Sequence, residues 1–176
     1  MLLEPVTPMP VTSLRRRQVR DPRSVARPLA ITSAVLTGVM AGGMVVIQVV
    51  LVPFWRGVPP ADFRRWFTAH VGRIRALMVP LGAGTGVACA ASAVAQRVAG
   101  RDGNPASVAA AAATAGVIAI TMTVNEPMNH RFTGGSLTDT ETTDLLSSWA
   151  RWHHVRVALG VAAAVAAASA LTQQDI

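Results

Sequence analysis

Residues 105–124 read PASVAAAAATAGVIAITMTV and contain no charged side chain. About twenty uncharged residues are what an α-helix needs to cross the hydrocarbon core of a bilayer. Three further stretches are equally free of charge, at residues 28–55, 76–96 and 157–174. Counting about twenty residues back from the end of the last stretch places a fourth span at 154–174, with Arg156 at the membrane boundary. The sequence therefore predicts an all-α, integral membrane four-helix bundle.

The bulk composition agrees with a membrane protein. Of 176 residues, 51% are hydrophobic and only 14% are charged, and the mean hydropathy is +0.40. The net charge of +7 is carried by Arg alone, but no stripe of Arg alternates with stacking aromatics, so we expect no nucleic acid partner. The single Cys89 excludes a disulfide framework within the chain. The expected partners are the lipid bilayer and a small lipophilic molecule, and the sequence does not indicate an oligomeric state.

Two segments outside the spans have their own character. Residues 1–27 are rich in Pro and Arg with little apolar periodicity, which predicts a disordered basic arm before a membrane domain at 28–176. Residues 59–75 place large apolar side chains at helical spacing with Arg between them. We interpret this second segment as an amphipathic helical lead-in, close to the membrane interface, that runs into the second span.

Consecutive spans cross the membrane in opposite directions, so four spans place most of the polar candidates on one membrane face. The end of span one, the start of span two, the end of span three and the start of span four all share that face. It holds all four His and a group of Asn, Glu and Arg: His70, His130, His153, His154, Asn125, Glu126, Asn129 and Arg156. Arg residues outside the spans divide evenly between the two faces. The dense cluster at residues 15–27 weakly favours a cytoplasmic N-terminus in the cell membrane.

The block after residue 124 reads NEPMNHRFTGGSLTDTETTDLLSSWARWHHVR and ends at Arg156. Pro127 removes a backbone N–H and disfavours helix at Glu126, so we expect span three to end there. In one interpretation Asn125 caps the freed carbonyls and Asn129 opens a loop. In the other, the two amides line the mouth of a cavity and orient an oxygen-bearing ligand, since polar groups inside a bundle are costly unless they serve a function.

The start of span four carries a second set of candidates. Trp149, His153, Arg156 and Gly160 follow helical spacing and share one face, whereas His154 points about 100° away and is expected at the surface. Paired Trp residues at a membrane boundary are also typical of an aromatic belt. Glu126 is expected to pair with Arg156 or Arg131. No H-x-x-x-H or E-x-x-H spacing occurs, so we predict no metal site.

These residues resemble the motifs of the DUF1772 family, the anthrone-oxygenase-like membrane proteins. The resemblance rests on N-E-P-M-N at 125–129, similar to the family's N-x-P-x-N, and on W-A-R-W-H-H-V-R at 149–156. A G-x-x-x-G in span one, Pro53 with Trp55, and V-P-P-A-D-F at 58–63 support it, and it extends over about residues 34–172. Family members more often carry an apolar residue where this chain has Glu126.

The resemblance implies an enzyme that oxidises an aromatic or polyketide-like substrate with O₂, without a bound metal or flavin. It places the motif positions at Asn125, Pro127, Asn129, Trp152, His153 and Arg156. On this basis His153 is the expected base, and Arg156, Asn125 and Asn129 are expected to hold an oxyanion. The expected substrate-binding residues are Trp149, Trp152, Glu126 and His70. The alternative is a non-catalytic membrane protein that binds a lipophilic ligand or a partner protein.

Overall fold

The computed structural model describes residues 22–100 and 104–173, and every regular element among them is a helix. The elements are α1 (Pro22–Val46), η1 (Ile47–Leu51), α2 (Val52–Gly57), α3 (Pro60–Val98), α4 (Pro105–Ile120), η2 (Thr121–Asn125), α5 (Glu126–Thr133) and α6 (Asp139–Thr172). They join into four rods, Ser24–Gly57, Pro60–Val98, Pro105–Thr133 and Asp139–Thr172, each long and apolar enough to cross a membrane. The predicted all-α four-helix architecture is confirmed.

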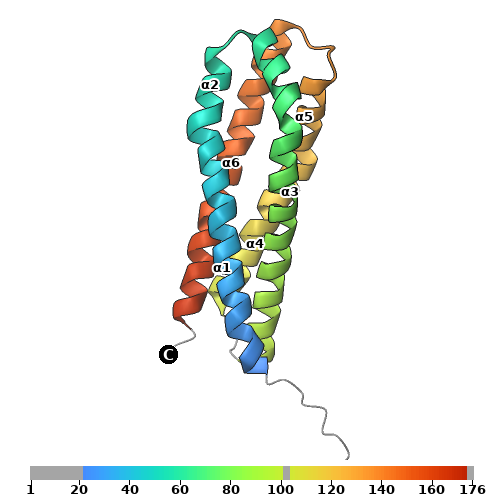
Figure 1. Ribbon diagram of the computed structural model, residues 1–176. Coiled ribbons are helices and arrows are strands. Elements are labelled where there is room, and N and C mark those ends of the chain that lie inside the picture. The colour runs from blue at the N-terminus through green and yellow to red at the C-terminus, as the bar shows by residue number, and fades with distance from the viewer. Residues whose placement is uncertain (1–21, 101–103, 174–176) are drawn as a thin grey trace, which may run out of the picture.

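The four rods run alongside one another and end in two unlike ways (Figure 1). At the upper end in the figure lie the α2–α3 and α5–α6 connections, here called the loop end. At the lower end lie the start of α1, the α3–α4 connection and the end of α6, here called the terminal end. The predicted parity therefore holds for the helices, with residues 56–60 and 125–139 at the same end. Because α1 begins at Pro22, residues 22–27 of the predicted arm are helical, and the rest of the arm lies outside the described residues.

Local sequence signals explain where three of the rods begin. Pro59 and Pro60 open α3, and the proline at N1 suits a helix start because its missing N–H would have no partner there. The side chain of Asn104 accepts from the backbone N–H of Ala106 at 3.1 Å and caps α4. Thr138 and Glu141 form a capping box at the start of α6, which binds two otherwise free N–H groups.

Two prolines inside the rods each follow a π-helical segment. Pro53 comes directly after η1 and Val52, and Pro127 directly after η2 and Glu126. A proline ring collides with the carbonyl one turn earlier, and a single wider turn makes room for it without ending the helix. The prediction that span three ends near Pro127 is wrong, since the helix continues to Thr133. Asn129 therefore lies within α5 and does not open a loop.

The predicted lead-in at residues 59–75 and the second span belong almost entirely to one helix. Residues 60–98 form the single 39-residue helix α3. Phe63 and Phe67 in its first turns are buried against Trp55 of α2 and Phe132 of α5, and Trp55 in turn packs on Trp149 of α6. We call these five residues the aromatic cluster. It closes the loop end of the bundle from inside.

Close approach of the helices depends on small residues that are not those of the G-x-x-x-G motif. A Cβ built on Gly38 or Gly42 would meet no atom within 4 Å, so that motif faces open space. A Cβ on Gly160 would collide with the methyl group of Met44. Gly160 thus leaves room for the end of the Met44 side chain where α6 passes α1 beside the predicted site.

Candidate functional site

A cavity of about 220 Å³ lies inside the bundle, between the aromatic cluster and the middle of the helices. All four rods contribute to its wall. Most of the lining is apolar, with four methionines, Met40, Met44, Met78 and Met122, among the lining residues. Methionine side chains are flexible and polarisable, so such a wall adapts to flat or irregular ligands.

The polar part of the lining forms one connected chain of contacts across three rods. Arg75 of α3 forms an ion pair with Glu126 of α5, with 3.2 Å between the Nη2 and Oε2 atoms. The amide of Asn129 donates to the other Glu126 oxygen at 3.0 Å, and Trp149 of α6 donates its indole N–H to Asn129 at 2.9 Å. These contacts hold one carboxylate, one amide and one indole in fixed positions at the cavity wall.

Arg156 completes the polar lining and keeps unused hydrogen-bonding capacity. It is 92% buried, and it is close enough to Glu126 to interact with it electrostatically. Its Nε has no hydrogen-bond partner among the described residues, and neither does the indole N–H of Trp55, which also lines the cavity. Buried N–H groups are normally paired, so the two unpaired donors are candidates to bind an acceptor on a ligand. Both nitrogens are covered by neighbouring atoms in this structure, so a ligand would have to displace those atoms to reach them.

His153 is fully buried beside the cavity but does not line it. Its Nε2 lies 3.1 Å from the backbone carbonyl of Met44. Because a carbonyl oxygen only accepts, Nε2 carries the proton in this contact. In the neutral ring Nδ1 is then the unprotonated nitrogen, and it has no partner among the described residues. The ring also stacks on Trp149, with 4.8 Å between centroids, so the imidazole is held from two sides.

The two asparagines of the N-x-P-x-N motif have different surroundings. Asn125 is completely buried, and its amide donates to the Trp149 carbonyl of α6 at 3.4 Å. The carbonyl that this amide contacts belongs to α6 and not to the rod that contains Pro127, which does not support the capping interpretation. Asn129 lines the cavity. Asn125 thus contacts the backbone of α6, whereas Asn129 faces the ligand space.

The structure separates the remaining sequence predictions into two groups. Trp149 and Glu126 line the cavity with Arg156 and Asn129. Trp152 is 40% exposed and does not line it, as an aromatic-belt residue would be placed. His70 does not line it either and stacks on Trp66, with 4.4 Å between ring centroids. His154 is exposed, as predicted.

Sequence reasoning missed Arg75 and Trp55 as cavity residues. Glu126 was expected to pair with Arg156 or Arg131, but its ion-pair partner is Arg75. Span parity already placed Arg75 on the correct face, yet several Arg residues share that face. Trp55 lies two residues after Pro53 at the end of span one. It is far in sequence from the N-x-P-x-N motif, so the sequence did not indicate that both border one cavity.

Within residues 22–100 and 104–173, no group of three or more His, Cys, Asp or Glu is arranged to hold a metal ion. Comparison with curated proteins found no match, and neither did comparison with solved structures. The family model described as anthrone oxygenase matches residues 63–166, from the start of α3 into the second half of α6. That match covers more than half of the 176-residue chain and both motifs of the cavity wall. The chain belongs to the anthrone oxygenase family.

Proposed function

We propose that this protein is a membrane-embedded tailoring oxygenase that oxidises an electron-rich aromatic or polyketide-like substrate with O₂, without a bound metal or flavin. The observation that carries the proposal is the pair of unpaired buried donors, on Arg156 and Trp55, in an otherwise largely apolar cavity. Such a cavity suits a flat, greasy molecule with one oxygen that becomes negatively charged during reaction. Family membership supports the same chemistry.

The proposed reaction converts the activated CH₂ of an anthrone into a carbonyl. A base removes one proton, and the negative charge spreads from the carbon onto the carbonyl oxygen of the anthrone. The resulting anion attacks O₂ and forms a C–O bond, and protonation gives a hydroperoxide. Loss of the second proton and cleavage of the O–O bond release water and leave the quinone carbonyl. One O₂ is consumed for each CH₂, with one oxygen atom in the product and one in water.

His153 is the proposed base, acting through Nδ1. The hydrogen bond from Nε2 to the Met44 carbonyl holds the ring in the tautomer with a free Nδ1. His153 lies between the two lining residues Trp149 and Arg156 on the same helix face. Catalytic contacts often tighten only when substrate is bound. The proposal therefore requires the Trp149–His153 stack to shift on binding, so that Nδ1 reaches the CH₂ group.

Arg156 and Asn129 are proposed to hold the oxyanion, with the Trp55 N–H as a third donor. Preorganised donors stabilise developing charge strongly in a site without water. Asn125 acts as a positioning residue in this scheme, since its amide contacts the Trp149 backbone. The substrate is a small lipophilic aromatic molecule taken from the bilayer of the cell membrane, and the N-terminus is proposed to face the cytoplasm.

The test is turnover by the purified protein in lipid nanodiscs. Anthrone is supplied under air, and quinone formation is followed by absorbance together with O₂ uptake, against empty nanodiscs. Wild type is expected to form quinone with one O₂ consumed per product, and His153→Ala to lose that activity. The matched control His154→Ala changes the exposed neighbour and keeps the rate.

Equal rates for wild type and His153→Ala would contradict the assignment of the base. The alternative, a non-catalytic binder of a lipophilic ligand or a partner protein, predicts ligand binding without O₂ uptake and tolerance of His153→Gln. A wild-type protein that binds anthrone and never forms quinone above the nanodisc background would favour that alternative.

A further inference from the structure

The wall of the cavity is closed on two sides and open on a third. The lining residues from α1 and α6 are buried, among them Met40, Met44, Trp149 and Arg156. The exposed apolar lining residues lie on α3 and η2: Val79, Ala83 and Met122. Met122 is 64% exposed although it lines the cavity. The cavity therefore opens between α3 and the α4–η2 helix, here called the lateral opening.

Two contacts between the rods Pro60–Val98 and Pro105–Thr133 bound the lateral opening. On the side of the terminal end, a Cβ on Gly86 would lie 2.9 Å from the Ile118 side chain, so α3 and α4 touch there. On the side of the loop end, the Arg75–Glu126 ion pair joins α3 to α5. From residue 75 to residue 86 an α-helix rises about 16 Å. That is tall enough for an aromatic ring system to pass edgewise.

The lateral opening lies at the depth of the lipid chains. Residues 76–96 of α3 and residues 105–125 of α4 and η2 carry no charge, so both of its sides belong to the hydrocarbon layer. On these two rods, the next charged residues toward the loop end are Arg75 and Glu126, at the upper bound of the opening. A molecule dissolved in the bilayer would meet the cavity here without crossing the polar loop end.

The cavity volume limits what it can enclose. At about 220 Å³, it is about half as large again as a dry apolar cavity of roughly 150 Å³ that holds benzene. A three-ring phenol has more than twice the non-hydrogen atoms of benzene. One ring with its reacting carbon fits beside Arg156, and the rest of a tricycle has to extend into the lateral opening.

We infer that substrates reach this site sideways from the hydrocarbon layer through the lateral opening, and that Ala83 and Met122 at its rim determine how many fused rings the site accepts. The inference rests on the proposed function for the class of substrate, a lipophilic aromatic phenol. The number of fused rings that the site accepts is then determined at the lateral opening. The donors of the inner wall serve every substrate alike.

The test measures binding, so it does not depend on turnover. Two probes are titrated into the full chain in nanodiscs, the one-ring 4-ethylphenol and the three-ring 1,8-dihydroxyanthraquinone. Binding is read from the tryptophan fluorescence of the chain, because two of its four tryptophans, Trp55 and Trp149, lie in the cavity wall. Ala83→Phe places a ring at the rim without adding a tryptophan. The matched control is Ala90→Phe, two turns further along α3, exposed and outside the cavity lining.

Ala83→Phe is expected to raise the Kd of the three-ring probe at least about tenfold and to leave the Kd of the one-ring probe within about twofold of the wild-type value. Ala90→Phe leaves both unchanged. A second pair, Met122→Phe with the exposed Val108→Phe as its control, is expected to repeat the result from the other side of the lateral opening. The inference is overturned if both rim variants bind the two probes as wild type does, or weaken both probes equally.

The two proposals fail differently. If wild type binds both probes, the rim variants discriminate between them, and no quinone forms from anthrone, then the lateral opening stands and the oxygenase proposal falls. If quinone forms and the rim variants convert anthrone as fast as their controls, the oxygenase stands and the lateral opening falls. Absence of any binding by wild type overturns both.

Discussion

The half of the bundle nearer the loop end, here called the loop half, and the half nearer the terminal end, here called the terminal half, are built by the same four rods but contain different kinds of buried side chain. Around the cavity, large aromatics and methionines meet, and buried polar atoms on Trp55, Arg156 and His153 have no partner among the described residues. Toward the terminal end the core is mostly small, with Ala30, Ala110, Ala163, Ala167 and Ala170 buried.

Hydroxyl groups in the terminal half mainly satisfy themselves. Thr37 donates to the Ser33 carbonyl at 2.7 Å, and Ser33 donates to the Ala30 carbonyl at 2.9 Å. Such bonds to the preceding turn leave nothing to bind a ligand. In the described residues the part toward the terminal end has one buried polar side-chain atom without a partner, Gln96 Oε1, and is otherwise packed with small side chains, while the part around the cavity keeps volume and several unpaired polar atoms. Unfilled volume and unpaired polar atoms lower stability, and proteins usually retain them only at functional sites.

The largest expected effect is on Arg156. Arg156→Met removes the buried donor while Glu126 keeps its partner Arg75, so the protein should stay folded. Loss of one preorganised donor costs about 100-fold or more in kcat when it stabilises a developing oxyanion. Quinone formation in nanodiscs measures the loss. The matched control is Gln96→Leu, which removes a fully buried polar side chain from the terminal half. A similar loss of activity in both variants would erase the distinction between the halves.

The second effect should fall on stability alone. Ala163 is completely buried in the terminal half, so Ala163→Leu overpacks the core and is expected to destabilise the protein by about 1–3 kcal/mol. Ala162→Leu changes the exposed neighbour and serves as the control. Thermal unfolding in detergent measures the difference, and KM for anthrone should not change. A shifted KM without a lowered unfolding temperature would show that the terminal half also shapes the site.

The comparison also shows what the sequence can and cannot predict. Absence of charge located the four rods, because an uncharged segment of about twenty residues has the length of a membrane-spanning helix, which pairs all its backbone groups internally. Helical spacing correctly placed Trp149, His153, Arg156 and Gly160 on one buried face. The continuation of the helix through Pro127 was not predictable from local rules, since they disfavour helix before a proline and do not foresee the π-helical turn of η2 that accommodates the ring.

Long-range partner choice was the other limit. Glu126 had several Arg residues available on one membrane face, and only the packing of α3 against α5 selects Arg75. Spacing likewise cannot tell a residue that lines a cavity from one that lies beside it. His153 and Arg156 share a helix face, yet the His153 ring is turned to the Met44 carbonyl and Arg156 to the cavity.

A smaller effect on activity is expected at Trp55. Trp55→Phe keeps a ring in the aromatic cluster and removes the unpaired indole N–H. If that N–H donates to the oxyanion, kcat/KM should fall about tenfold, the value of one hydrogen bond to a charged group. The control is Trp66→Phe, since Trp66 contacts Trp55 but does not line the cavity. An equal response of the two variants would assign the effect to aromatic packing and not to the donor.

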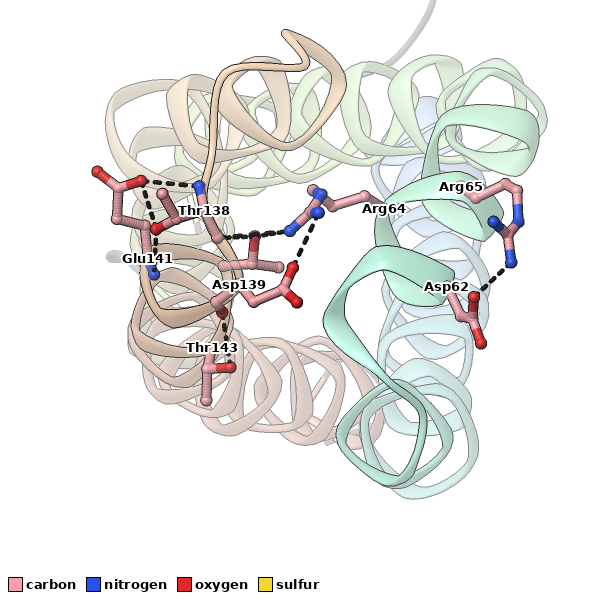
Figure 2. Close-up of polar contacts among 8 residues, drawn as sticks. Asp62, Arg64, Arg65, Thr138, Asp139, Glu141 and Thr143 are labelled. Atoms are coloured by element: carbon pink, nitrogen blue, oxygen red, sulfur yellow. Dashed lines mark hydrogen bonds and ion pairs between the residues drawn. The ribbon is translucent and has the colours of Figure 1, made fainter.

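The smallest effect concerns how the loop end is tied together. Figure 2 shows Arg64 of α3 reaching across to the first turn of α6, where it donates to the Thr142 hydroxyl at 2.6 Å and pairs with Asp139 at 3.0 Å. Its neighbour Arg65 pairs with Asp62 inside the same helix. The first contact joins two rods and the second joins none.

Arg64→Ala should therefore lower the unfolding free energy by about 1 kcal/mol, because a half-buried charged hydrogen bond between helices is lost. Arg65→Ala removes an exposed pair within one turn and should cost no more than about 0.5 kcal/mol. Thermal unfolding of the two variants in the same detergent compares them directly, at low and high salt. An equal loss in both would mean that the loop end is held by the aromatic cluster alone, and that the polar contacts above it add nothing to the rigidity of the cavity.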